Sequence, residues 1–213
     1  MNREGFIREN TSVLAPPLVP EIRLHLAHEA IAIWHKTEEE LGAIGLPPPF
    51  WAFAWAGGQA LARHVLDNPE IVLGHSGIDL AAGSGLVAIA AMRAGAERVL
   101  AADIDPFAEA SIRINAALNG VACEATSRDL LASPAPACGF ILVGDLFYEK
   151  ELAARVLDWI SAARRQGTRV LVGDPGRSYF PKDRFRMVAE YQVPVTRELE
   201  DCEIKRTAVW QLA

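Results

Sequence analysis

An aspartate and a tyrosine stand three positions apart in the stretch VGDLFYEK, directly after a run of apolar residues that predicts a buried strand. Asp145 can hold an incoming ammonium group and orient the amine once its proton has left. Tyr148 can add a hydroxyl acceptor and an aromatic face, which attracts a cation. Such a pair can serve a site that uses an amine as a nucleophile. Two plainer interpretations stay open: Asp145 could cap the next helix, and Tyr148 could pack at its start.

An amine nucleophile sets demands that such a site must meet. A lysine amine has a reference pKa of about 10.4, so only about one molecule in a few thousand is neutral at pH 7. Removing water from the site favours the neutral form. Alignment of the lone pair with the group to be transferred would then supply most of the rate. We therefore expect Asp145 and Tyr148 to be the catalytic residues, with Phe147 beside them contacting the substrate.

A second group of candidates surrounds the glycine turn in GIDLAAGSG. Asp79 ends a predicted strand, Gly83 and Gly85 turn the chain into a helix, and Asp103 ends the following strand, where a carboxylate can bind both hydroxyls of a ribose. The spacing fits the dinucleotide fingerprint, in which an acid follows about 20 residues after the first glycine. It fits an S-adenosylmethionine site equally well, since that geometry needs an acid before the turn, which Asp79 supplies.

Further candidates follow the later strands. Asp129 and Leu130 come after the third strand, where they can contact an adenine ring. Asp174 and Arg177 lie in the turn GDPGRSYF after the fifth strand, at the rim of the same crevice, and we expect them to contact the substrate. The alternative for this turn is a structural Asp–Arg pair.

The elements that must position these residues alternate between short apolar strands and helices from residue 77 onward, which predicts an α/β fold with a mostly parallel sheet covered on both faces. Two final strands without a helix between them predict a terminal antiparallel hairpin. We expect a Rossmann-like sheet of seven strands over residues 57–213 and a proline- and tryptophan-rich cover over residues 1–56, with a helix from about Pro20 to Trp34.

Composition narrows the classes of function. The 213 residues carry a net charge of −6, which disfavours nucleic acid as a partner. Three scattered cysteines favour a reducing compartment, and we find no apolar segment that predicts a membrane span or a secretory signal. His25 and His28 lack a third ligand at a usual spacing, so we expect no metal. These features predict a cytoplasmic protein, and we expect a monomer.

Several of these stretches together resemble a known family. PPPFWAFAWAGGQALARHVLDNP, GIDLAAGSG, LAADIDPFA, VGDLFYEKELA and VLVGDPGR, in this order, are similar to the electron transfer flavoprotein β-subunit lysine methyltransferases, from FIRENTSVLAPPLVPEI to TAVWQL. These belong to the class I, seven-β-strand methyltransferases with an Asp-x-x-Tyr motif. The resemblance implies S-adenosylmethionine as the methyl donor and lysines of the flavoprotein β subunit as acceptors. It also implies that Trp55 lies against the methionine portion of the cofactor.

One position departs from the family pattern, because Ala81 stands where the usual turn has its first glycine. We expect cofactor binding to survive the added methyl group. Three other functions remain open at this stage: methylation of a small molecule or of another protein, such as a ribosomal protein; a nicotinamide-dependent oxidoreductase; and a binding module without catalysis.

Overall fold

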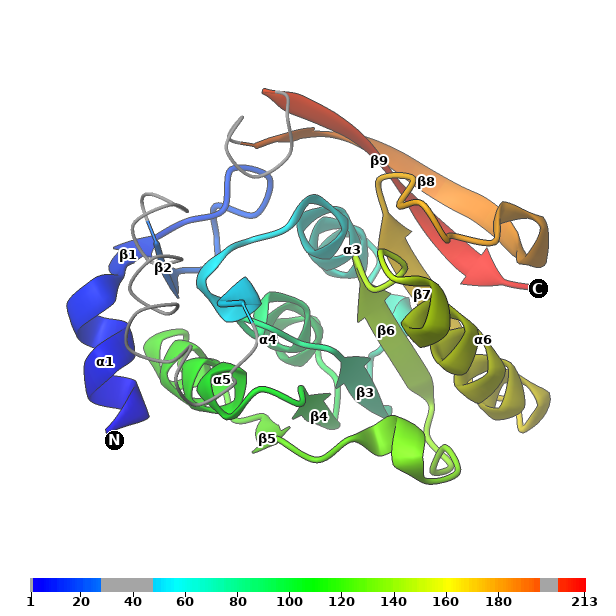
Figure 1. Cartoon of the computed structure of the whole chain (residues 1–213), viewed down its shortest axis with the longest axis horizontal. Coiled ribbons are helices and arrows are strands. Elements are labelled where there is room, and N and C mark those ends of the chain that lie inside the picture. The colour runs from blue at the N-terminus through cyan, green and yellow to red at the C-terminus, as the bar shows by residue number, and fades with distance from the viewer. Residues whose placement is uncertain (1, 28–47, 196–202) are drawn as a thin grey trace.

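The computed structural model describes residues 2–27, 48–195 and 203–213 (Figure 1). Its main sheet contains β3 (Ser76–Leu80), β4 (Arg98–Ala102), β5 (Glu124–Thr126), β6 (Phe140–Gly144), β7 (Arg169–Asp174), β8 (Phe185–Pro194) and β9 (Ile204–Leu212). The helices are α1 (Arg3–Asn10), α3 (Ala56–Asp67), α4 (Leu86–Arg93), α5 (Pro106–Leu118) and α6 (Lys150–Arg165). No helix within the described ranges is long and apolar enough to cross a bilayer.

The strands of the main sheet run in the order β5-β4-β3-β6-β7-β9-β8. The first five are parallel, whereas β9 pairs antiparallel with both β7 and β8. The predicted α/β fold with a terminal antiparallel hairpin is therefore confirmed. In this order the chain leaves β3 toward β4 and β5, and later returns to β6 on the other side of β3. Ligands bind at such a switch point, beyond the carboxyl ends of the strands.

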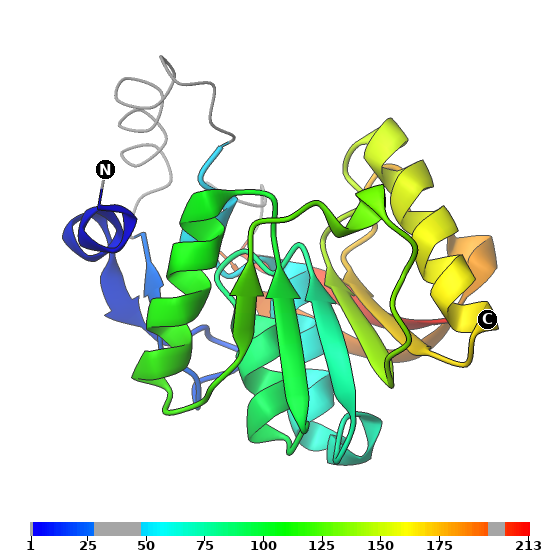
Figure 2. The same ribbon diagram turned by 90° about the horizontal axis from the view of Figure 1, so that it is seen from below.

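The strand register brings those carboxyl ends to one edge. Leu80 is the partner of both Ala102 and Val143, and Gly144 pairs with Gly173. Figure 2 shows β3, β4 and β5 ending side by side at this edge. The residues that follow these strands are therefore neighbours in space, although they are far apart in sequence.

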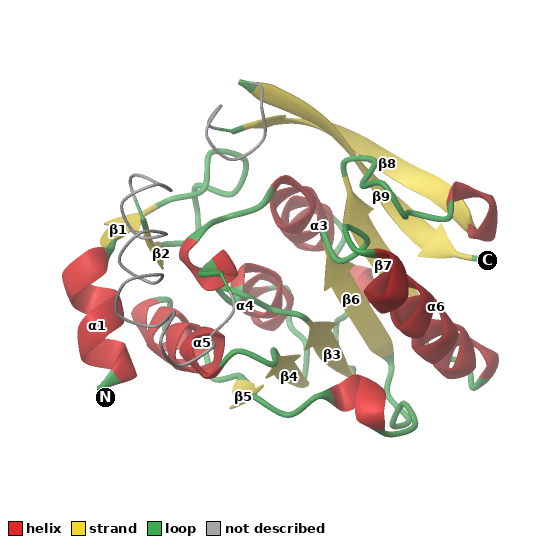
Figure 3. Ribbon diagram, viewed as in Figure 1, coloured by secondary structure: helices red, strands yellow, loops and turns green. Residues whose placement is uncertain are grey.

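Helices cover both faces of the sheet, with α3, α4 and α5 on one side and α6 on the other (Figure 3). The side chains of β6 alternate accordingly. Phe140 and Leu142 pack in the core beneath α3 and α4, whereas Ile141 and Val143 pack in the core beneath α6. A strand buried on both faces must be apolar at every position, which explains the run FILV.

The N-terminal segment differs from the sequence prediction. The expected helix from Pro20 to Trp34 is wrong over its described part, because Leu24–Leu26 form β2, which pairs antiparallel with β1 (Ser12–Leu14). Leu24 and Leu26 are buried while His25 is half-buried, and this period of two fits a strand. Residues 28–34 of that predicted helix lie outside the described residues.

Two asparagines, Asn115 in α5 and Asn119 directly after it, hold this segment in place. The Asn115 side chain accepts a hydrogen bond from the backbone N–H of His25 (2.8 Å) and donates one to the carbonyl of Ser84 in the glycine turn (2.8 Å). Asn119 accepts from the N–H of Arg23 and donates to the carbonyl of the same residue. The N-terminal segment is thereby connected to the helix that flanks the cofactor turn.

Candidate active site

A cavity of about 390 Å³ opens at the carboxyl edge of the sheet, which is a usual size for a site that holds a small molecule. It extends from the end of β4 to the end of β6. Of the residues singled out in the sequence, the cavity is lined by Trp55, Gly83, Asp103, Asp129, Leu130, Asp145, Tyr148 and Arg177. Asp79, Gly85, Phe147 and Asp174 do not line it.

The glycine turn provides the backbone wall of the cavity. Gly83 and Gly85 have φ values of 52° and 82°, and Ala81 has a φ of 56°. A left-handed backbone costs alanine roughly 1–2 kcal/mol, whereas glycine adopts it freely. Ala81 nevertheless lines the cavity, and it also packs against the core beneath α6. A Cβ at Gly83 would have nothing nearer than 3.9 Å, so the turn leaves open space for a ligand at that position.

Asp103 is held where the turn and the end of β4 meet. One oxygen, Oδ2, accepts the N–H of Gly83 at 2.9 Å, and Oδ1 accepts the N–H of Asp105 at 3.0 Å. Burial raises the pKa of Asp103, and the backbone hydrogen bonds oppose this shift. The carboxylate lines the cavity with its orientation fixed by backbone groups, as binding of ribose hydroxyls requires.

Asp79 occupies a different place from the one expected. It is 1% exposed, and its Oδ2 accepts the N–H of Ala88 in the first turn of α4 at 2.8 Å. Burial, with a smaller contribution from the Asp103 charge, raises the pKa of Asp79 to about 8. The expectation that this side chain contacts the cofactor is therefore corrected: Asp79 joins β3 to α4 beneath the turn. Gly85 lies beside it as the residue that precedes α4, and its Cα packs toward Ile112.

Asp129 and Leu130 border the far end of the cavity. Asp129 caps the short 3₁₀ turn Leu130–Ala132 through the N–H of Leu131, and it forms an ion pair with Arg155 at 2.9 Å. Leu130 offers half-buried apolar surface to the cavity. This end offers an apolar surface beside a carboxylate, and its contact with adenine stays a prediction.

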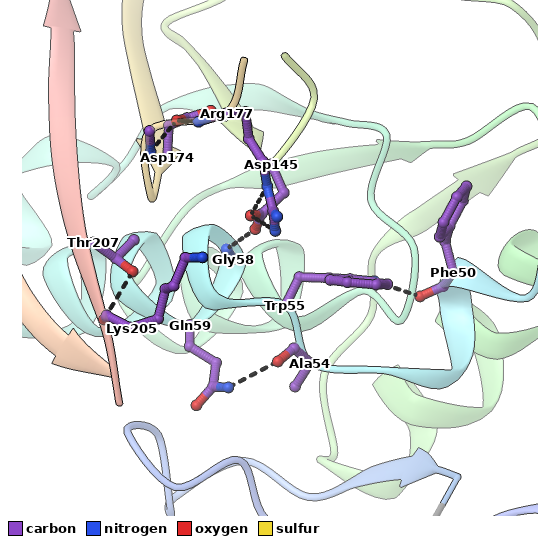
Figure 4. Close-up of polar contacts among 11 residues, drawn as sticks. Phe50, Ala54, Trp55, Gly58, Gln59, Asp145, Asp174, Arg177, Lys205 and Thr207 are labelled. Atoms are coloured by element: carbon purple, nitrogen blue, oxygen red, sulfur yellow. Dashed lines mark hydrogen bonds and ion pairs between the residues drawn. The ribbon is translucent and has the colours of Figure 1, made fainter. Parts of the chain in front are cut away.

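Aromatic rings form the wall between the two ends. Trp55 donates its Nε1–H to the carbonyl of Phe50 at 3.0 Å (Figure 4). The ring of Phe50 lies 5.8 Å from the rings of both Trp55 and Tyr148. Burial raises the pKa of Tyr148, and the Asp103 charge adds to this shift. Trp51 is 2% exposed and stacks on Phe107, although it also borders the cavity.

Asp145 is fixed by groups from two places, the first turn of α3 and the turn after β7. Its Oδ2 accepts the N–H of Gly58 in the first turn of α3 at 2.9 Å. Its Oδ1 accepts Nε and Nη2 of Arg177 at 3.1 and 2.6 Å (Figure 4). Its φ of 55° turns the chain sharply after β6. The alternative that Asp145 caps α6 is excluded, because Glu149 caps that helix.

Two residues expected to touch the substrate are buried instead. Phe147 is fully buried, with its ring 5.2 Å from that of Phe180 and 6.2 Å from that of Phe185, so it belongs to the core beneath α6. Asp174 is 1% exposed, and its Oδ1 accepts the N–H groups of Gly176 and Arg177. The predicted Asp174–Arg177 contact thus runs through the backbone, and the Arg177 side chain turns to Asp145.

Sequence reasoning missed Phe50 and Gly58. Phe50 lies in the quoted stretch PPPFWAFAWAGG, but its type alone does not separate a cavity wall from the core. For Gly58, the glycine pair in AWAGG is the sequence feature that could have indicated its close contact with Asp145. A Cβ at Gly57 would collide with the carbonyl oxygen of Gly173, so only glycine lets α3 approach β7 closely enough for Gly58 to reach Asp145.

Comparisons with solved structures agree with this fold. A ribosomal protein L11 methylase from Lactobacillus delbrueckii subsp. bulgaricus superimposes with a TM-score of 0.51 at 22% identity, covering 72% of this chain and 76% of the other. Magnesium protoporphyrin IX methyltransferase from Synechocystis PCC 6803, with bound SAH, gives 0.53 at 16% identity, covering 73% and 82%. At these identities the similarity establishes the class I methyltransferase fold.

Comparisons of sequence go further. The family model of ribosomal protein L11 methyltransferase matches residues 62–136. The electron transfer flavoprotein beta subunit lysine methyltransferase of Xenopus laevis is 38% identical over 97% of this chain and 85% of its own length. The human protein of the same name is 36% identical over 97% and 80%. Given this similarity over nearly the whole chain, the protein belongs to the electron transfer flavoprotein beta subunit lysine methyltransferase family.

Proposed function

We propose that this enzyme transfers methyl groups from S-adenosylmethionine to lysine side chains of the β subunit of electron transfer flavoprotein. One observation carries the proposal: a single cavity joins a carboxylate suited to a ribose, Asp103, to a carboxylate and a tyrosine suited to an amine, Asp145 and Tyr148. Family membership supports the same substrate, since the relatives from Xenopus laevis and human are named for it.

The residues around the cavity fit the cofactor. The open backbone at Gly83 leaves room for the amino-acid portion, Asp103 can accept the hydrogens of both ribose hydroxyls, and Leu130 offers an apolar surface to the adenine. When bound, S-adenosylmethionine supplies an electrophilic methyl group on a positively charged sulfur. Trp55 lines the cavity between the two ends and can lie against that portion of the cofactor.

The acceptor end then has three tasks, each performed by side chains of this chain. Tyr148 and Trp55 exclude water and present ring faces that attract the lysine ammonium. Asp145 accepts a hydrogen bond from the amine and thereby aims its lone pair. The proton leaves to solvent, and the rate comes from proximity and alignment in place of a strong base. We propose Asp145 and Tyr148 as the catalytic residues on these grounds.

Methylation of a ribosomal protein is the second candidate, and it is weaker. The match to the ribosomal protein L11 methyltransferase family covers residues 62–136, which contain the glycine turn and Asp103. It does not include Asp145, Tyr148 or Arg177. The matched part therefore holds the cofactor end of the cavity, which methyltransferases with different substrates share, and leaves the acceptor end unmatched.

The remaining features of the proposal concern where and how the enzyme works. We propose a cytoplasmic monomer that acts on protein and not on nucleic acid. Cys123 and Cys138 are free thiols, which fits a reducing compartment, and the net charge of −6 opposes binding to phosphate backbones. The division into a cover at 1–56 and a catalytic domain at 57–213 likewise stays a prediction.

Mass spectrometry tests the central proposal directly. Purified electron transfer flavoprotein is incubated with the enzyme and S-adenosylmethionine, and gains of about 14 Da per methyl group are expected on β-subunit lysines. The variant Asp145→Asn serves as the control and should give no gain. An unmodified flavoprotein, together with calorimetric binding of the cofactor by the wild-type enzyme, would rule out this substrate and leave the methyl donor in place.

A further inference from the structure

The carboxylate at the acceptor end of the cavity is paired with a cation of the chain itself. Arg177 places Nε and Nη2 on Oδ1 of Asp145, and both side chains are largely buried, at 20% and 10% exposed. Both residues also line the cavity, so the ion pair stands at the place where the lysine must bind. The acceptor amine therefore meets a carboxylate whose charge is already offset.

Several contacts hold Arg177 in this position. The buried Asp174 carboxylate accepts the N–H groups of Gly176 at 2.6 Å and of Arg177 at 2.7 Å, which fixes the turn after β7. The Arg177 guanidinium also lies 5.8 Å from the centre of the Trp55 ring (Figure 4). The backbone and the guanidinium are thus both restrained, and the pair with Asp145 is a built feature of the site.

The chemistry explains why such a pair is useful. An unpaired carboxylate beside a lysine stabilises the ammonium form, which has no lone pair and cannot accept a methyl group. A fixed positive charge on the same carboxylate opposes that stabilisation, while an oxygen of the carboxylate can still orient the amine. The site must hold the amine and must also let it lose its proton, and these two demands conflict. The positive charge of Arg177 on the same carboxylate allows both.

We propose that Arg177 is a positioning residue for methyl transfer, which fixes the Asp145 carboxylate and offsets its charge so that the bound lysine can release its proton to solvent. Arg177 acts through Asp145 and takes no proton itself. The inference builds on the proposed lysine methylation and adds to it a group that controls the protonation state of the acceptor.

Other charged or titratable groups face this corner from the neighbouring elements: Asp103 after β4, Tyr148 before α6, Asp174 at the end of β7, Lys182 after β7 and Lys205 on β9. All of them stay the same in the variants compared below. A difference between wild type and variant therefore reports the charge at position 177.

The test measures kcat and KM for the flavoprotein between pH 6.5 and 9.5 at saturating cofactor, in wild type, Arg177→Gln and Arg177→Lys. Because kcat reports ionisations in the enzyme–substrate complex, its rising limb follows the bound amine. Arg177→Gln should move that limb upward by about 1–2 pH units, which lowers kcat roughly tenfold or more at pH 7 and restores it at high pH. Arg177→Lys, which keeps the charge but loses the planar fork, should retain the wild-type midpoint.

Two outcomes would overturn the inference. An equal loss for Arg177→Gln at every pH would mean that the arginine matters only for the local structure. A lower KM with undiminished kcat would mean that Arg177 blocks the amine site until substrate displaces it. Arg98→Gln removes an exposed arginine paired with Glu124, far from the cavity, and should leave the whole profile unchanged. Absence of methylation by wild type would count against the substrate, whereas an unshifted profile with an active wild type would count against Arg177 alone.

Discussion

The two ends of the cavity are each built around one aspartate at the end of a strand, but the two carboxylates are held in different ways. Asp103 is fixed by the backbone N–H groups of Gly83 and Asp105, and it forms no ion pair with a cation among the residues that the structure describes. Asp145 is fixed by one backbone N–H and by the guanidinium of Arg177. Ribose hydroxyls are neutral donors, for which a negative acceptor is suitable. A lysine arrives charged and must become neutral, so the negative charge of the carboxylate that receives it is offset by Arg177.

Removal of the carboxylate at the acceptor end should have the largest effect. In Asp145→Asn we expect kcat to fall by about 100-fold or more, because the amide has one acceptor oxygen in place of two, and Arg177 and the N–H of Gly58 already donate to this side chain. Affinity for the cofactor should stay within about twofold of wild type. Quantitative mass spectrometry and calorimetry measure the two quantities. Turnover close to the wild-type rate would place the catalytic group elsewhere.

The close backbone packing that supports Asp145 gives the next largest effect. Gly57→Ala would force a methyl group into the carbonyl of Gly173, and we expect a loss of roughly 2–4 kcal/mol of unfolding free energy. Gly58→Ala is the matched control. Its methyl group would come no closer than 4.0 Å to Val87, and alanine favours the helix by about 0.5–1 kcal/mol. Urea denaturation separates the two. Equal stabilities would show that α3 and β7 can separate at no cost.

At the cofactor end, we expect Asp103→Ala to weaken binding of S-adenosylmethionine by roughly 1–3 kcal/mol, the scale of lost hydrogen bonds to a charged group. This corresponds to about 5- to 150-fold in Kd. Titration calorimetry measures it, and S-adenosylhomocysteine should show the same loss, since both carry the ribose. An unchanged affinity would refute the ribose assignment and remove the contrast between the two ends.

The smallest effect concerns Asp79, which lies beneath the cofactor turn and outside the cavity. Its pKa in the folded protein is about 8, above its ordinary value of 3.8. Between these two pH values the folded state keeps a proton on Asp79 that the unfolded state has lost. That contribution to stability is fully present below about pH 4 and is lost as the pH rises through 8. Asp79→Asn cannot ionise, and it should gain at least about 1 kcal/mol over wild type on going from pH 5 to pH 8.5. Thermal unfolding at both values tests this, and a constant difference would contradict it.

The sequence predicts the parallel core of the fold because apolar strands that are buried on both faces have a clear signature. It is misleading at Leu24–Leu26, where Pro20 upstream favours the start of a helix but pairing with Ser12–Leu14 selects a strand. A pairing between two segments cannot be read from the sequence of either one alone. The alternating burial of Leu24–Leu26 that fits a strand becomes visible only in the structure.

In the candidate site, too, some features can be predicted from the sequence and others depend on the folded backbone. Strand ends can be recognised in the sequence, and the three residues predicted after them, Asp103, Asp145 and Tyr148, line one cavity. Which way a side chain turns after a strand depends on the backbone: the positive φ of Asp145 sends Phe147 into the core and leaves Tyr148 half exposed. Likewise, nothing in the spacing of 32 residues between Asp145 and Arg177 indicates that these two side chains pair.

The double hydrogen bond of Asn115 makes the N-terminal segment a thermodynamic partner of the cofactor turn. One amide group holds the Ser84 carbonyl and the His25 N–H at the same time, so a displacement of either one strains the bond to the other. Linkage is reciprocal: a ligand that orders the turn tightens the hold on the N-terminal strand, and loosening of that strand weakens the ligand by the same factor. The stability of the N-terminal strand and the affinity for the ligand are therefore coupled through the Asn115 side chain of α5.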